Sequence, residues 1–367
     1  MEYFFILGRN PQLSYAELQC YFESRGIKFD VMAFERNYLL LSFEKEIKVD
    51  IQEFGGVVKV GKILYRGNDN NFGKFLENYI MEIDKFSFCV TGSSDSEELE
   101  EALMEKFKHE RIKAQVRHGR NKMLLQKGEY VLMPNADVEF FFYKIQAELF
   151  FGRVEQDYSY TEVKERDMHK PFRRESLAIS PRLSKILVNI TQVKPGQLLL
   201  DPFCGVAGII QEALLKGVNC YGIDKDKDAI ESAKKNLKWL SQNYKLEANY
   251  TLLNADSKNA PNIRVDGVAT EPALGEIVRR KLRDNEAKEF IERFERMIVP
   301  VLKRIVQIKK PGARIAITLP YIREHSVNIA KVCQMTGLKK IEIPGVESPI
   351  KEVREGQFIA REIVVLS

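Results

Sequence analysis

The chain has 367 residues, which is too long for one hydrophobic core and suits two or three domains. Hydrophobic residues make up 44% and charged residues 30% of the chain, and no run of about 18 apolar residues occurs, so we expect a globular protein of the cytoplasm without a membrane span. The five cysteines are scattered and form no C-x-x-C pair, so we expect neither a metal site nor a disulfide framework. The net charge of +5 is uneven, because residues 1–165 hold 22 basic and 28 acidic residues whereas the remainder holds 35 and 24, so a surface for an acidic partner should lie mainly on the second half.

Residues 1–65 predict a small α+β unit. We expect Tyr3–Leu7 to form a strand, and Ser14 with Glu17 has the spacing of a capping box that starts a helix. The segments YLLLSFE and VGKILYRG predict two further short strands.

Residues 66–165 predict a second α+β unit. KFSFCVTGS, KGEYVLM and DVEFFFYKI are typical of strands, and SEELEEALMEKFKHE is an amphipathic helix with Leu99, Leu103 and Phe107 spaced four apart. Between them, Lys106–Lys127 carries eight Lys or Arg residues and one acid. This stretch is either a solvated helix end and loop or a patch that contacts phosphates. For the second interpretation the candidate contacts are Lys113, Arg117, Arg120 and Lys122.

Residues 166–194 predict a linker between domains. Six Lys or Arg residues lie between Arg166 and Lys185, and two prolines interrupt the segment. Arg173 and Arg174 are candidate contacts to a nucleic acid here.

Residues 195–367 predict an α/β domain. Apolar strands such as QLLLD, NCYGID, ANYTLLNAD, VDGVATEP and ARIAITLP alternate with helical patterns, which is typical of a mostly parallel sheet covered by helices on both faces. Ligands of such sheets bind at the carboxyl ends of the strands.

Acidic residues end three successive predicted strands. Asp201 precedes a turn through Gly205 and Gly208 that lacks both the G-x-G-x-x-G and the G-K-[ST] patterns, so it suits a ligand with an amino group and no pyrophosphate, such as S-adenosylmethionine. Asp224 is placed to accept from ribose hydroxyls and Asp256 from an adenine amino group. Asp228 is expected to cap the helix that follows Asp224.

The segment TEPALG follows the fourth strand, where amino-methyltransferases hold the target base. Glu271 can accept from an exocyclic amine, Pro272 keeps the turn, and Leu274 can pack on a base without offering an aromatic face. The loop is either a working variant or a structural and binding loop.

The chain resembles the tRNA guanosine-N2 methyltransferases of the archaeal guanosine-10 type. The resemblance lies in FILGRNPQLSYAEL, in ERDMHKPFRRESLAISPRLSKILVNIT and in DPFCGVAGI, where a third Gly is more usual than Ala207. It implies a ferredoxin-like piece at 1–65, a THUMP-like RNA-binding domain at 66–165, a linker at 166–194 and a Rossmann-like methyltransferase domain at 195–367.

The resemblance also implies the roles of the site residues. Glu271, Pro272 and Leu274 would align with the acid, proline and aromatic of the catalytic D-P-P-Y loop. The residues implied to hold S-adenosylmethionine are Asp201, Pro202, Phe203, Cys204, Gly205, Gly208, Asp224 and Asp256.

Three functions remain open from the sequence. The first is methylation of the N2 of a tRNA guanosine, and the second is RNA binding by a methyltransferase fold whose TEPALG loop is catalytically silent. The third is methylation of an amine on another nucleic acid, such as DNA. The expected partner is tRNA, with an accessory subunit left open and with no membrane or metal.

Overall fold

The computed structural model describes residues 1–92, 96–118, 121–124, 130–133, 136–173, 179–273, 280–353 and 358–367. These residues form two compact units, each built from segments that are not contiguous in the chain. Unit 1 comprises Met1–Pro11, Lys28–Ile51 and Val57–Tyr158, and unit 2 comprises Gln12–Ile27, Gln52–Gly56 and Ser159–Ser367. The division into four segments inferred from the sequence stays a prediction.

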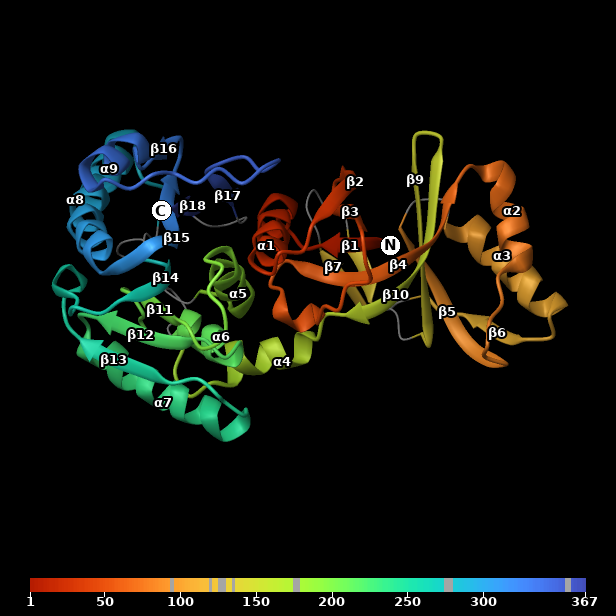
Figure 1. Cartoon of the computed structure of the whole chain (residues 1–367), viewed down its shortest axis with the longest axis horizontal. Helices are drawn as coiled ribbons and strands as arrows, with labels where there is room; N and C mark the ends of the chain where they lie inside the picture. Colours follow the sequence, from red (N-terminus) through yellow and green to blue (C-terminus); the bar gives the residue numbers. More distant parts are fainter. Residues whose placement is uncertain are drawn as a thin grey trace. The chain divides into compact units, whose positions relative to one another are not determined.

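Unit 1 is built around one eight-stranded sheet with the order β2-β3-β1-β4-β10-β9-β5-β6 (Figure 1). Its strands are β1 (Glu2–Leu7), β2 (Phe29–Glu35), β3 (Tyr38–Phe43), β4 (Val57–Gly67), β5 (Lys85–Gly92), β6 (Lys113–Val116), β9 (Val138–Ile145) and β10 (Glu148–Asp157). Two helices, α2 (Asp69–Asn78) and α3 (Ser96–His109), belong to the same unit, and β7 (Asn121–Leu124) pairs with β8 (Tyr130–Met133) in a separate ribbon.

The core of unit 1 lies between its helices and the sheet. The apolar stripe predicted for α3 is confirmed, because Leu99, Leu103 and Phe107 are buried against the aromatic side chains of β5, β9 and β10. The sheet joins strands from both predicted N-terminal segments, since β4 pairs with β10. The expected boundary after residue 65 therefore falls inside a continuous sheet.

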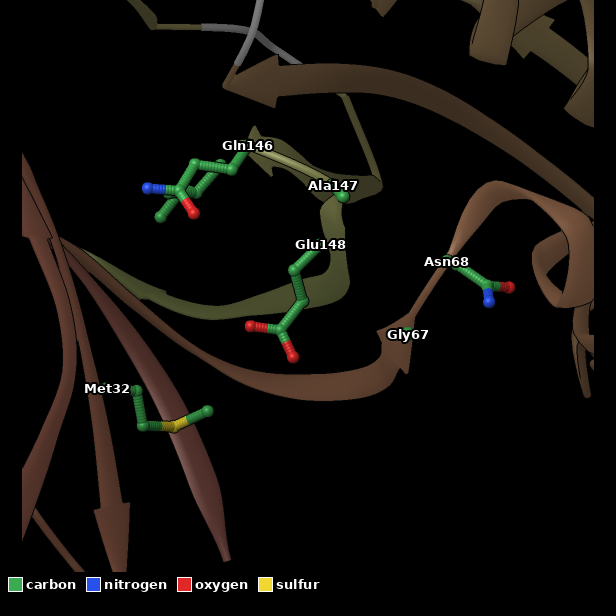
Figure 2. A pocket seen from close by; sticks show the side chains of 7 residues that line it. Met32, Gly67, Asn68, Gln146, Ala147 and Glu148 are labelled. Carbon is green, nitrogen blue, oxygen red and sulfur yellow. The ribbon is translucent and has the colours of Figure 1, made fainter.

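A shallow pocket opens in unit 1 at the turn between β9 and β10 (Figure 2). Met32, Asn68 and Glu148 are among the residues that line it. Glu148 is the charged side chain of this lining, and its carboxylate already accepts from Arg66 Nε at 2.6 Å.

Unit 2 contains a mostly parallel sheet with the order β13-β12-β11-β14-β15-β18-β17, in which β18 pairs antiparallel with both of its neighbours, β15 and β17 (Figure 1). Its strands are β11 (Leu198–Asp201), β12 (Asn219–Asp224), β13 (Tyr250–Asn254), β14 (Val265–Thr270), β15 (Lys309–Ile322), β16 (His325–Ser326), β17 (Ile350–Glu352) and β18 (Ala360–Leu366). Its helices are α1 (Pro11–Ser24), α4 (Tyr160–Lys164), α5 (Pro181–Ile190), α6 (Gly208–Leu215), α7 (Lys227–Asn243), α8 (Asp284–Ile308) and α9 (Ile329–Thr336). This is the predicted Rossmann-like α/β fold.

Helices cover both faces of this sheet. Buried side chains of α1, α5, α6 and α7 form one core cluster, and those of α8 and α9 form the other. The predicted linker thus contributes a packed helix, because Leu187, Val188 and Ile190 of α5 are fully buried. Among the residues that the structure describes, none of the helices is long and apolar enough to cross a membrane.

Helix α1 corrects the predicted capping box. The helix begins at Pro11, and proline is favoured in the first helical turn because its missing N–H needs no partner there. Ser14 and Glu17 therefore lie inside the helix, where both side chains are buried. Glu17 serves another purpose, which is to bind backbone groups of a distant segment.

Glu17 lies at the centre of a buried polar network in unit 2. Its carboxylate accepts from the backbone N–H groups of Gly55 and Gly56, both at 2.7 Å, and from the Asn189 side-chain amide at 2.6 Å. The Lys216 ammonium donates to Asn189, and burial lowers the pKa of Lys216 to about 8. These contacts attach α1 and the 52–56 segment to α5 and α6.

Candidate active site

Asp201, the last residue of β11, carries the most deeply buried acid of the site. Its Oδ1 accepts from the Thr270 hydroxyl at 2.8 Å and from the Phe203 backbone N–H at 3.2 Å. Burial raises the pKa of Asp201 to about 7, although both hydrogen bonds oppose the shift. A carboxyl group with this pKa gains much from a cationic partner.

The turn after β11 is organised by Asp224 at the end of β12. Asp224 Oδ2 accepts from the Gly205 N–H at 2.9 Å, and Oδ1 accepts from the Asp226 N–H at 2.9 Å. Gly205 has φ of +51°, in the left-handed region that favours glycine, and Ala207 has φ of +70°. The two predicted acids are thus brought together by one loop.

Asp256 lies just after β13, and its side chain is more exposed than that of Asp201. Its side chain accepts from the Lys258 N–H at 3.1 Å and lies 3.1 Å from the Lys258 ammonium. The backbone hydrogen bond lowers the pKa of Asp256, so the group is ionised at neutral pH. Asp256 caps the short helix Ser257–Asn259 and still presents a carboxylate beside β12.

The helix after Asp224 is capped by a residue other than the predicted one. Asp226, not Asp228, is the N-cap of α7, and its side chain accepts from the N–H groups of Asp228 and Ala229 at 2.9 and 3.2 Å. The prediction of Asp228 was wrong because the helix begins at Lys227, two residues earlier than a cap at Asp228 would start it.

Glu271 directly follows β14 and belongs to the same edge of the sheet. Strands β12, β11 and β14 are neighbours and run parallel, so Asp224, Asp201 and Glu271 all lie at their carboxyl ends (Figure 1). The Glu271 carboxylate accepts from Nε of Arg361 on β18, and the two side chains are only 10% and 11% exposed. Pro272 is buried next to it, whereas Leu274 lies outside the described residues.

The predicted nucleic-acid contacts are distributed over both units. Lys113 is exposed on β6 and Arg117 is exposed just after it, while Arg173 lies 3.5 Å from Asp167. Arg120 and Arg174 lie outside the described residues, as does the side chain of Lys122. No described contact joins these residues to the strand-end acids.

Two residues of the site were missed from the sequence. Thr270 has no distinctive motif, because a threonine at the end of a strand is common. Arg361 lies 90 residues from Glu271 in the chain, so no local spacing links them. A basic residue in the last apolar strand, REIVVL, was the available signal for Arg361.

Comparison with known proteins supports a methyltransferase domain. Residues 170–310 match the model of the UPF0020 family, described as an RMKL-like methyltransferase domain. The chain is 35% identical over 99 residues to the tRNA (guanine(10)-N2)-dimethyltransferase of Methanothermobacter thermautotrophicus, covering 27% of this chain and 28% of that protein. The corresponding enzyme of Pyrococcus abyssi is 34% identical over 110 residues, covering 29% and 31%.

The matched stretches span less than a third of the length of these two relatives. Among solved structures, TrmN from Thermus thermophilus aligns over 100% of this chain and 99% of its own, with a TM-score of 0.56 and 16% identity, which shows a common fold. The predicted likeness to the tRNA guanosine-N2 methyltransferases is confirmed, and within this chain residues 170–310 are similar to a methyltransferase domain.

Proposed function

We propose that the protein transfers a methyl group from S-adenosylmethionine to the exocyclic N2 of a guanosine in tRNA. The observation that carries the proposal is the placement of Asp201, Asp224 and Glu271 at the carboxyl ends of three neighbouring parallel strands. Open α/β sheets bind their ligands at this edge. The names of the curated relatives support guanosine N2 in tRNA as the target.

The residues after β11 and β12 suit S-adenosylmethionine as the donor. Asp201 offers a buried carboxyl for the amino group of the methionine part, and Asp224 has lone pairs left for ribose hydroxyls after binding two N–H groups. A Cβ built at Gly205 would meet no atom of the described residues within 4 Å, so open space adjoins this backbone. When bound, the donor supplies an electrophilic methyl group on a sulfonium that leaves as a thioether.

Glu271 and the backbone after it would orient the acceptor amine. An exocyclic amine is a weak nucleophile because its lone pair is delocalised into the ring. When Glu271 and the following carbonyl accept its two N–H bonds, the lone pair turns toward the methyl group, and the nitrogen gains a methyl as it loses one proton. Positioning of this kind supplies much of the rate of a two-substrate reaction.

The proposal is tested with unmodified tRNA transcripts and isotope-labelled S-adenosylmethionine. After incubation with the purified full chain, the RNA is digested and labelled nucleosides are identified by mass spectrometry. We expect labelled N2-methylguanosine, and none from the Asp224→Ala variant. Label on another nucleoside, or no label despite measured binding of donor and tRNA, would contradict the proposed target.

Gly205→Ala is expected to weaken donor binding as well as stability. The left-handed backbone at Gly205 makes a Cβ cost about 1–2 kcal/mol, and the new methyl enters the open space beside the turn. Gly196→Ala is the matched control, because Gly196 has φ of +80° and also meets no described atom within 4 Å, but it precedes β11. Urea unfolding should report similar losses for both, whereas calorimetry with S-adenosylhomocysteine should report weaker binding only for Gly205→Ala.

A second candidate function is RNA binding without methyl transfer. The observation that favours it is the ion pair of Glu271 with Arg361. A carboxylate that already binds a guanidinium has less capacity to accept from a target amine, and the loop that carries it departs from D-P-P-Y. In this case the exposed basic residues of unit 1, Lys113 and Arg117, would contact the RNA. The same assay separates the two, because a silent loop binds tRNA and the donor but labels no nucleoside.

A further inference from the structure

We infer that Arg361 is a positioning residue that holds the carboxylate of Glu271 where it can accept the target amine. The inference rests on the proposed function and adds to it a residue that the D-P-P-Y resemblance does not contain. It also accounts for glutamate at a position where the resemblance predicts aspartate.

The sheet places Arg361 two strands away from Glu271. Arg361 on β18 lies opposite Pro320 of β15, and β15 runs parallel to β14, which ends at Thr270. The ion pair therefore spans β15, from the edge of β14 to β18. A glutamate arm is one methylene longer than an aspartate arm, so it extends farther from β14 toward β18.

A second acidic residue lies beside Arg361 in the sheet. Glu352 of β17 lies directly opposite Arg361 in the antiparallel register, so the two side chains share one face of the sheet. Glu352 is buried as well, at 8% exposure. Arg361 thus lies between two acidic positions, and its planar group is a stable anchor for the Glu271 carboxylate.

This anchor determines what Glu271 can do. A carboxylate that accepts from a guanidinium in a site with little solvent is held in one orientation, because the hydrogen bond and the opposite charge both favour that placement. Glu271 then acts as a fixed acceptor for an N–H bond. Without Arg361, three side-chain torsions of the glutamate become free, and the acceptor atom moves away from the amine.

The test compares Arg361→Gln with Arg361→Lys in the full chain. For Arg361→Gln we expect kcat for methyl transfer to fall about 100-fold, as for an acceptor displaced by about 1 Å, with KM for tRNA and the affinity for S-adenosylhomocysteine nearly unchanged. Arg361→Lys keeps the charge and should restore part of kcat. Arg314→Gln is the matched control, because Arg314 also belongs to an ion pair, with Glu23 at 3.0 Å. Arg314 lies opposite Gly267, near the start of β14, whereas Glu271 follows the end of that strand.

A double-mutant cycle distinguishes positioning from a structural role. If Arg361 acts through Glu271, Arg361→Gln should have no further effect on kcat in a Glu271→Gln background. Glu271→Asp should lose about as much activity as Arg361→Gln, because the shorter arm cannot reach the guanidinium.

The inference is overturned if Arg361→Gln leaves kcat unchanged, if its effect is equally large in the Glu271→Gln background, or if Glu271→Asp is fully active. These outcomes leave the proposed function standing, since the unchanged protein still methylates tRNA. If the unchanged protein methylates no RNA, both the proposed function and the inference fail.

Discussion

Glu17→Ala is expected to lower the free energy of unfolding by about 3–5 kcal/mol, the range measured when one partner of a buried charge network is removed. Glu17 is fully buried, and its carboxylate binds two backbone N–H groups and the Asn189 amide. Alanine would leave the two backbone N–H groups buried without this acceptor and would leave the Asn189 amide with only the Glu53 carbonyl. It would also remove an acidic group near the buried Lys216. Urea unfolding followed by circular dichroism measures the loss.

Glu23→Ala is the control for this prediction, because Glu23 belongs to the same helix and its side chain is 63% exposed. Its removal should cost less than about 1 kcal/mol. Similar losses for the two variants would show that the network around Glu17 does not hold α1 in unit 2. A large loss for Glu17→Ala alone would show that unit 2 depends on helix α1 for its stability.

The fold of unit 2 was largely predictable from the sequence. Buried parallel strands appear as short apolar runs, and the alternation of QLLLD, NCYGID and VDGVATEP with helical patterns identified both the elements and their order. The membership of α1 in this unit was not predictable. Its contacts join Glu17 to Gly55 and Asn189, which are distant in sequence, and no local pattern encodes them.

Unit 1 was predictable only in part. The strands β1, β3, β4, β5, β8 and β9 were predicted because their aromatic and aliphatic residues are concentrated in short runs. The strands β2, β6, β7 and β10 and the helix α2 were missed. β2 has no fully buried residue, and the second half of β10 alternates between exposed and half-buried residues, so neither β2 nor β10 has the uniform apolar run of a core strand.

The strand-end acids show what a sequence can predict about a site. Asp201, Asp224 and Glu271 were predicted because each follows an apolar run, and parallel strands bring such ends together. Their partners were not, since Thr270 and Arg361 reach the site through tertiary packing. The sequence therefore identified the charged groups but not the neighbours that set their charge and orientation.

Asp201→Asn is expected to abolish donor binding, with at least about a 100-fold loss of affinity for S-adenosylhomocysteine, as for removal of one partner of a buried charge pair. Asparagine can still accept from Thr270 and Phe203 through its Oδ1, so the local structure should persist. Calorimetry measures the affinity. Binding that is unchanged in Asp201→Asn would remove Asp201 from the donor site.

The same substitution should raise stability above neutral pH. Burial raises the pKa of Asp201 from its ordinary value of 3.8 to about 7, so the folded state favours the protonated carboxyl. For an acid with a raised pKa, the folded state binds more protons than the unfolded state between these two values, and the free energy of unfolding falls as pH rises from about 4 to 7. The cost at pH 8 is on the order of 4 kcal/mol.

Asp201→Asn has no carboxyl to ionise, so it should match the unchanged protein below about pH 4 and exceed it at pH 8. Asp228→Asn is the control, because it makes the same chemical change at an exposed residue at the start of α7. Urea unfolding at several pH values gives both profiles. If Asp201→Asn gains stability and loses affinity for the methyl donor, this buried acid serves binding at the expense of the stability of the fold. If the two pH profiles are parallel, Asp201 is ionised in the folded protein without a cost in stability.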